Sequence, residues 1–317
     1  MGFVARASNN TDTMTPAQGI PAPLLAYITA HPPSGPIACI SGTIDPFSVT
    51  STKCNNSAAI AKNLTFNQEK VKPMSSSTIN CSTYCSAGTY NYATGSTNFD
   101  GWTGYATVPS NPSTSYSSPS TLAYWLGSTN CAGVGTCSLR TYILQAGLIY
   151  GTDGSSNSHH PYMFVNFYDS GGLCDTAYSC GTSATVSVGD TMYFDQVWLP
   201  VQGEWDVYAE DQTASTYVEL LVAPGTGGYP PNGTTGIPYG AVAMEAYSAS
   251  AASDYPSGGV SFTTILGANN NSPSTPLLGT SVTFFNPVSG SGRTATVSYS
   301  TYSCGSYTCA DESIGVT

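Results

Sequence analysis

From residue 98 onward, apolar and polar positions alternate with a period of two, as in β-strands that bury one face. Runs rich in Val, Ile, Thr, Tyr and Phe are separated by Gly, Pro, Asn and Ser, which favour turns. The pattern predicts strands at 102–108, 121–127, 139–150, 162–169, 184–188, 191–199, 204–210, 216–222, 241–248, 259–266, 281–285 and 294–302. Because no helical spacer separates these strands, we expect an all-β fold, an antiparallel β-sandwich or jelly roll.

Residues 1–95 differ from the rest of the chain in pattern and in charge. They read as loops and short strands, and 21–31 is the one stretch there that could form a helical turn or two. They carry five of the seven basic residues and three of the eighteen acids, so this part is +2 and the remainder is −13. Such a leader is typical of an inhibitory pro-segment, and equally of a plain extension or accessory subdomain. The sequence thus predicts a leader at 1–95 and a β-sandwich at 96–317.

The ten cysteines form close pairs along the chain, which favours local disulfides, although spacing alone leaves their connectivity open. The predicted pairs are Cys39 with Cys54, Cys81 with Cys85, Cys131 with Cys137, Cys174 with Cys180, and Cys304 with Cys309. No pair has the two-residue spacing and nearby His of a zinc site, so we expect no metal. Six N-x-Ser/Thr sequons begin at Asn9, Asn55, Asn63, Asn80, Asn232 and Asn270. These features predict a secreted or cell-surface glycoprotein.

Only 8% of the residues are charged, so hydration rests largely on hydroxyl and amide groups. Such a surface keeps its hydration when carboxylates become protonated below about pH 4, which favours an acidic medium. A net charge of −11 argues against a nucleic-acid partner. No apolar run is long enough for a membrane span, and the first 30 residues show no intact signal peptide.

The common hydrolase motifs are missing from this sequence. There are three histidines, His31, His159 and His160, and no Gly-x-Ser-x-Gly elbow, which excludes the usual serine triad. The segment GEWDVYAED offers carboxylates for a glycosidase at Glu204, Asp206, Glu210 and Asp211. Strand alternation places Glu204, Asp206 and Tyr208 on one face, which we interpret as a solvated sheet face over a hydrophobic one.

The segment ILQAG at 143–147 resembles the I-L-Q-T-G segment of eqolisin-type glutamic peptidases, in which the Gln is catalytic. Four more segments resemble pieces of that family in the same order: GYATVPS at 104–110, YWLGS at 124–128, YMFVNFYD at 162–169 and VSVGDTM at 186–192. The resemblance covers about residues 98–290 and implies a concanavalin-like β-sandwich with acid endopeptidase activity. Asn166 stands where the family has an acidic residue, so substrate preference is not carried over.

The catalytic Glu of that family opens an A-E-W-I-x-E strand, and AVAMEAYSAS here holds one acid, Glu245. One alignment keeps Glu245 as the catalytic residue, and the segment then also resembles G-G-E-V-Y of neprosin-type glutamic peptidases, which have a long pro-segment. A second alignment places Glu245 on the family's second Glu and Ala241 at the catalytic position, which implies a non-peptidase relative. The first alignment is the prediction.

The resemblance implies that Glu245 acts as general base and then acid, that Gln145 donates to the oxyanion and positions water, and that no cofactor takes part. Trp125, Asn166 and Tyr168 are the predicted substrate-binding residues for a polypeptide, with activity highest below about pH 5. Two other functions stay open: a self-associating subunit of an extracellular filament or coat, and a carbohydrate- or surface-binding module.

Overall fold

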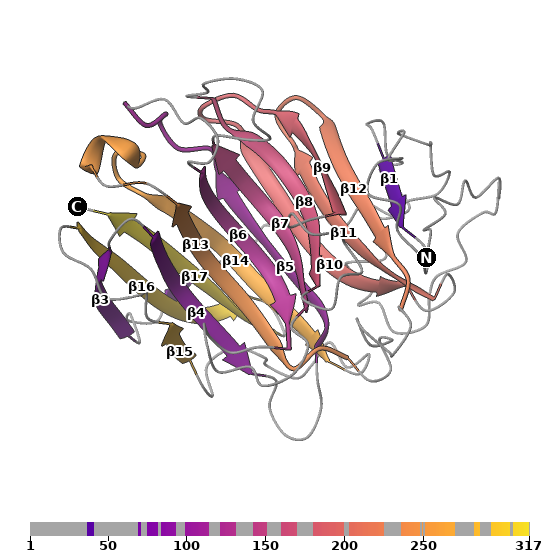
Figure 1. Ribbon diagram of the computed structural model, residues 1–317. Helices are drawn as coiled ribbons and strands as arrows, with labels where there is room; N and C mark the ends of the chain where they lie inside the picture. The colour runs from indigo at the N-terminus through magenta and orange to yellow at the C-terminus, as the bar shows by residue number, and fades with distance from the viewer. Residues whose placement is uncertain are drawn as a thin grey trace.

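The computed structural model consists almost wholly of β-strands in two antiparallel sheets that pack as a sandwich (Figure 1). It describes residues 37–40, 69–70, 75–81, 84–92, 99–113, 121–130, 142–150, 160–169, 180–199, 203–224, 236–247, 249, 251–269, 282–285, 293–304 and 307–316. The predicted all-β sandwich is therefore confirmed. No helix in these ranges has the length and hydropathy needed to cross a membrane.

One sheet has ten described strands. Its order is β1 (Ile37–Ile40), β12 (Thr216–Val222), β11 (Glu204–Asp211), β10 (Thr191–Leu199), β5 (Phe99–Thr107), β14 (Val260–Asn269), β17 (Tyr307–Val316), β16 (Arg293–Cys304) and β2 (Glu69–Lys70), and β3 (Ser75–Cys81) also pairs with β16. All described pairs are antiparallel except β1 with β12, which is parallel.

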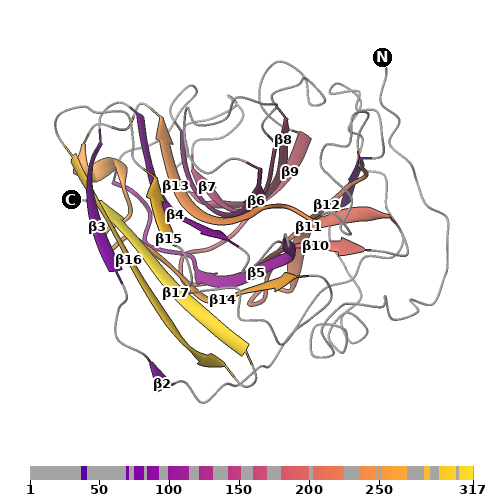
Figure 2. The same ribbon diagram turned by 90° about the horizontal axis from the view of Figure 1, so that it is seen from below.

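The other sheet has seven described strands. Its order is β15 (Val282–Phe285), β4 (Tyr84–Tyr92), β13 (Tyr239–Tyr247), β6 (Thr121–Thr129), β7 (Tyr142–Tyr150), β8 (Tyr162–Asp169) and β9 (Cys180–Thr185). Figure 2 shows β13, β6, β7 and β8 curving around the side that is turned away from β5, β10 and β14. We call this side of the seven-stranded sheet its outer face.

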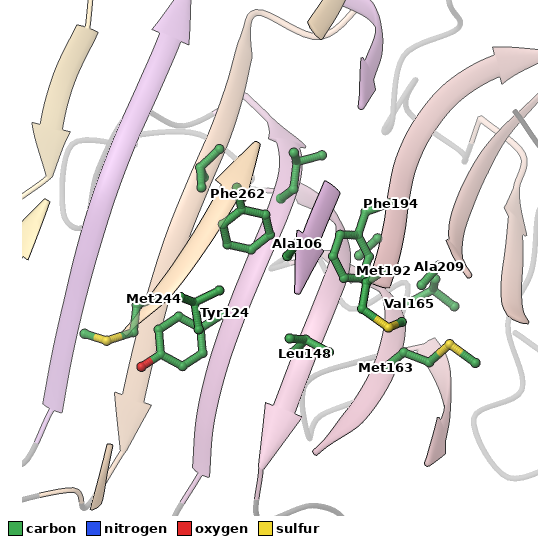
Figure 3. Close-up of a cluster of buried hydrophobic side chains, with 14 of the residues drawn as sticks. Ala106, Tyr124, Leu148, Met163, Val165, Met192, Phe194, Ala209, Met244 and Phe262 are labelled. Atoms are coloured by element: carbon green, nitrogen blue, oxygen red, sulfur yellow. The ribbon is translucent and has the colours of Figure 1, made fainter. Parts of the chain in front are cut away.

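The core fills the space between the two sheets because each strand turns its apolar residues inward. Tyr124, Leu148, Met163 and Met244 come from the seven-stranded sheet and meet Phe194 and other inward residues of the ten-stranded sheet (Figure 3). Each of these side chains is fully shielded from solvent. Burying apolar surface on this scale is the main favourable term for the fold.

Three polar contacts join the sheets through this core. The indole N–H of Trp102 on β5 donates to the carbonyl oxygen of Ala241 on β13 at 3.1 Å. The amide of Gln196 on β10 donates to the carbonyl of Leu126 on β6, also at 3.1 Å. The Thr89 hydroxyl on β4 donates to the carboxyl group of Glu312 on β17. These contacts hold β6 and β13 in place relative to the other sheet.

The predicted strands agree closely with the observed ones at 162–169, 191–199 and 216–222. β9 lies at Cys180–Thr185, before the predicted 184–188, because residues 188–189 form a turn in which Gly189 has a φ of 91°. That turn leads from the seven-stranded sheet to the ten-stranded sheet and so is not a hairpin. β17 was not predicted, and the predicted helical turn at 21–31 lies outside the described residues.

Four strands fall inside the predicted leader. β4 pairs with β13 over nine residues, from Tyr84↔Tyr247 to Tyr92↔Tyr239, so it is an integral strand of the seven-stranded sheet. β3 pairs with β16 from Ser75 to Cys81. Removal of a pro-segment at residue 95 would take both strands out of the sandwich. The boundary at 95 stays a prediction, with this consequence attached.

The prediction of a solvated face on β11 is wrong. Alternation does place Glu204, Asp206 and Tyr208 together, but Asp206 is 0% exposed and Tyr208 is 1% exposed. Only Glu204 of the three is partly exposed. The face of β11 that carries the Asp206 carboxyl group is therefore largely buried.

Candidate functional site

The predicted site residues all lie on the outer face of the seven-stranded sheet. In-register residues of neighbouring strands share a face, so the sheet can be described as rows that run across β13, β6, β7 and β8. The residues that alternate with the outer-face positions along each strand, such as Leu126, Leu144 and Val242, point into the core. The folded chain thus brings Trp125, Gln145, Asn166, Tyr168 and Glu245 to one side of one sheet.

The row through Gln145 contains Ala241. Gln145 pairs with Gly127 on β6, and Gly127 pairs with Ala241 on β13. On the other side Gln145 pairs with Asn166 on β8. Across two strands, the residue opposite Gln145 is therefore an alanine, which is 0% exposed and carries no carboxylate.

Glu245 lies two rows further along, where it pairs with Ala123, which in turn pairs with Ile149. Four residues along a strand and two strand spacings place the α-carbons of Glu245 and Gln145 roughly 16 Å apart. A shared water requires both side chains within hydrogen-bond reach of it, about 3 Å. This register does not support a Gln145–Glu245 pair around one water, and it matches the second alignment, with Ala241 at the position opposite Gln145.

Gln145 is 7% exposed and hydrogen bonded to its row neighbour. The amide Nδ2 of Asn166 donates to Oε1 of Gln145 at 2.7 Å. This bond directs the Gln145 oxygen toward β8 and leaves its amide Nε2 as the group that can donate to a ligand. Asn166 Oδ1 is buried without a hydrogen bond.

Trp125 lies between the row of Gln145 and the row of Glu245. It pairs with Ala243 and Gly147, and its side chain is 1% exposed. A Cβ built on Gly127 would lie 3.0 Å from Cε3 and Cζ3 of the indole, so the benzene edge of the ring lies over Gly127. Phe164, Ala241 and Ala243 belong to the same apolar cluster.

The other edge of this indole faces Glu245. Its N–H acts on the Glu245 carboxyl group and lowers the pKa, although no hydrogen bond of normal geometry forms at Trp125 Nε1. Desolvation is the larger effect and raises the pKa of Glu245 to about 7. A carboxyl group with this pKa exchanges protons near neutral pH, unlike an ordinary surface glutamate.

Sequence reasoning did not predict the proximity of Trp125 N–H and Glu245. No local motif announces it, because the two residues are 120 positions apart and meet only through the β6–β13 register. Tyr168 is on the outer face as well, but it pairs with Ile143, one row beyond Gln145 and away from Glu245. On the described parts of β4, β13, β6, β7 and β8, Glu245 is the single carboxylate at a position that lies on the outer face of the sheet.

Metal and disulfide predictions are only partly addressed by the structure. Within the described ranges, no three or more His, Cys, Asp or Glu side chains are arranged to hold a metal ion. No described cysteine is free, and Cys309 is disulfide-bonded. The pairing of the ten cysteines stays a prediction.

Comparisons with known proteins give a similarity to solved structures and none to a family model or a curated protein. A solved structure of SCP-B, a member of the eqolisin family of peptidases, in a complex with the tripeptide Ala-Ile-His, matches with a TM-score of 0.35 and 16% identity. The match covers 59% of this chain and 80% of that chain. A similarity at this level is too low to transfer an activity or a residue role.

Proposed function

We propose that the protein is an exported hydrolase of polypeptides whose outer face binds the substrate and whose general acid–base is Glu245. The observation that carries this proposal is a partly exposed carboxyl group with a pKa of about 7, next to an indole N–H that makes no regular hydrogen bond. A group that titrates near the working pH can both accept and deliver a proton during amide hydrolysis.

In this proposal the roles differ from those that the resemblance implies. Glu245 takes the proton of a water that attacks the scissile carbonyl and delivers a proton to the leaving amine. The N–H of Trp125 is the donor near the developing oxyanion. Gln145, about 16 Å away along the curved face, binds a peptide group of the substrate through Nε2.

The pH dependence follows from the direction of the Glu245 shift. As a base Glu245 must be ionised, so activity should rise as the pH approaches about 7 and fall in stronger acid. The optimum below about pH 5 that the resemblance implies would instead require a carboxyl group with an ordinary pKa. Export, glycosylation and a removable leader remain parts of the proposal, supported by the paired cysteines, the sequons and the basic leader.

The test is a digestion assay with the full chain on unfolded protein substrates across acidic to neutral pH. Glu245→Gln should lower kcat/KM by at least about 100-fold, since a general acid–base contributes about 10² to 10⁴. Gln145→Ala should act mainly on KM. The matched control is Glu204→Gln, a partly exposed glutamate on the other sheet, which should leave the rate unchanged. Equal rates for wild type and Glu245→Gln would refute the assignment.

A second candidate is a polypeptide-binding face without catalysis, and the Ala241 position favours it. In the row of Gln145 the folded chain offers two amides, a glycine and an alanine, which can bind but not hydrolyse. This candidate predicts no cleavage by the wild type at any pH together with measurable peptide binding, which Gln145→Ala weakens and Glu245→Gln does not.

A further inference from the structure

Asn166 and Gln145 form a pair on the outer face, and the proposed mechanism gives a role to only one of them. They are opposite each other on β8 and β7, and Nδ2 of Asn166 donates to Oε1 of Gln145 at 2.7 Å. Along the same row, β6 and β13 contribute Gly127 and Ala241, which have no polar side-chain atom. Among the described residues, Asn166 is therefore the hydrogen-bond partner of the Gln145 side chain.

This hydrogen bond fixes the direction of the Gln145 amide. A carboxamide accepts at its oxygen and donates at its nitrogen. Turning the Gln145 amide around would bring its Nε2 against Nδ2 of Asn166, two donors without an acceptor, at a residue that is only 7% exposed. Nε2 is thus the end offered to a ligand, and it can only donate. The group that it binds has to be an acceptor, such as the carbonyl oxygen of a peptide.

The surface around this polar point is apolar. Ile143 and Ile149 are outer-face residues of β7 on either side of Gln145, and both are partly exposed. The row between Gln145 and Glu245 belongs to the apolar cluster that contains Trp125. A chain that reaches from one polar group to the other therefore crosses apolar surface.

The two polar points also set a length. In the register Trp125 lies halfway between Glu245 and Gln145, whose α-carbons are roughly 16 Å apart. An extended polypeptide advances about 3.3 Å per residue, so about five residues cover this distance. A shorter peptide reaches one of the two groups but not both.

We propose that the outer face binds an extended polypeptide that reaches at least about five residues beyond the bond at Glu245, and that Asn166 positions Gln145 to donate to a backbone carbonyl oxygen of that chain. This inference rests on the proposed function, because it takes Glu245 as the point of cleavage. It adds a minimum substrate length. It also makes Asn166 the residue that selects an acceptor at the far point.

The first test measures Kd for capped peptides of Ala and Leu of increasing length. The protein is the full chain with Glu245→Gln, which keeps the peptides intact. Kd should fall by about fivefold or more in one step at about five residues, because the hydrogen bond to Gln145 is then added. Adding Gln145→Ala should remove the step and leave the Kd of shorter peptides unchanged. A smooth dependence on length, or a step that persists in Gln145→Ala, would overturn the proposal.

The second test reverses the hydrogen-bond polarity at position 166, again with Glu245→Gln. In Asn166→Asp the ionised carboxylate only accepts, so Gln145 turns Nε2 toward β8 and loses its contact with the peptide. The step should disappear near about pH 7 and return near about pH 3, where the protonated carboxyl group donates to Oε1. A merely structural role of Asn166 would give the same loss at both pH values, and that result would overturn its positioning role.

The matched control is Ser183→Asp, which adds a carboxyl group to the same face on β9. Ser183 is exposed and pairs with Phe164, one row away from Asn166. The new carboxyl group does not face Gln145, so the step should be present at both pH values. If Ser183→Asp also loses the step only near neutral pH, a general effect of charge explains the result and the role of Asn166 is refuted.

Failure of this inference and failure of the proposed function are distinguishable. Binding is measured without cleavage, so a length step that depends on Gln145 supports the two-point face even if the wild type cleaves no substrate. Cleavage that Glu245→Gln abolishes, together with no length step, keeps the proposed function and overturns the two-point face. The length series with native Asn166 is decisive even where Asn166→Asp fails to fold.

Discussion

At the scale of single residues, Trp125 has the most specific chemical role in the proposed site. Its benzene edge covers Gly127, and its N–H edge faces Glu245. The indole therefore lies between Gln145 and Glu245. It also lowers the pKa of Glu245, the one carboxyl group on the outer face of the described part of the sheet. The sequence could assign this tryptophan equally to the core or to a binding face, and in the fold its side chain is buried in an apolar cluster on the outer face.

Trp125→Phe keeps an aromatic ring on this face and removes the N–H. Because that N–H lowers the pKa of Glu245, we expect the pKa to rise above about 7. A carbon-detected NMR titration of the Glu245 carboxyl group measures the change. Trp198→Phe on β10, remote from Glu245, is the control. A pKa that stays the same or falls would contradict the proposed contact.

At the scale of elements, glycines determine how closely β6 and β7 approach. A Cβ on Gly147 would lie 2.1 Å from the carbonyl oxygen of Tyr124 and 2.7 Å from the α-carbon of Trp125. Both neighbours are backbone atoms of a central strand, so they cannot move without disturbing the β6–β7 ladder. The site face depends on this close approach, because β6 carries Trp125 and β7 carries Gln145.

Gly147→Ala should therefore destabilise the protein by about 3 kcal/mol or more, as expected when a core position is overpacked against backbone. Chemical denaturation gives the free energy of unfolding. Gly315→Ala is the matched control, since a Cβ there meets nothing within 4 Å. Similar losses for the two variants would show that the close approach in the β6–β7 pair is not the cause.

At the scale of the whole molecule, several carboxyl groups are buried, and burial favours their protonated form. Burial raises the pKa of Glu312 well above 4.5, and the Thr89 hydroxyl opposes this rise. Glu312 joins the two sheets, whereas buried Asp195 and Asp206 lie on the outer side of the ten-stranded sheet. Both arrangements favour protonated carboxyls, so the free energy of unfolding should fall as the pH rises above about 4.5.

Glu312→Gln removes one of these titrations while its amide can still accept from Thr89. We expect the dependence of the free energy of unfolding on pH to become shallower by up to about 1.4 kcal/mol per pH unit between about pH 4.5 and the folded pKa. Denaturant titrations at several pH values measure this slope. A Glu312→Gln slope equal to that of the wild type would refute the role of this group.

Strand positions and face assignment could be predicted from the sequence because they depend on local alternation. A period of two along β7 places Leu144 and Leu148 in the core and Gln145 on the opposite face. The β-sandwich class follows from many such strands without helical spacers. β3 and β4 were assigned to a leader because polar, Ser- and Tyr-rich strands give a weak alternation signal.

Only the tertiary structure decided which residues meet. A shift of four residues in the β6–β13 register would keep the same faces, so alternation cannot distinguish Ala241 from Glu245 as the residue opposite Gln145. Burial of Asp195, Asp206 and Glu219 was also beyond the sequence, because a row of acids has the pattern of a solvated face. The sequence by itself determined the faces of the strands, and pairing across distant strands determined the chemistry that those faces present.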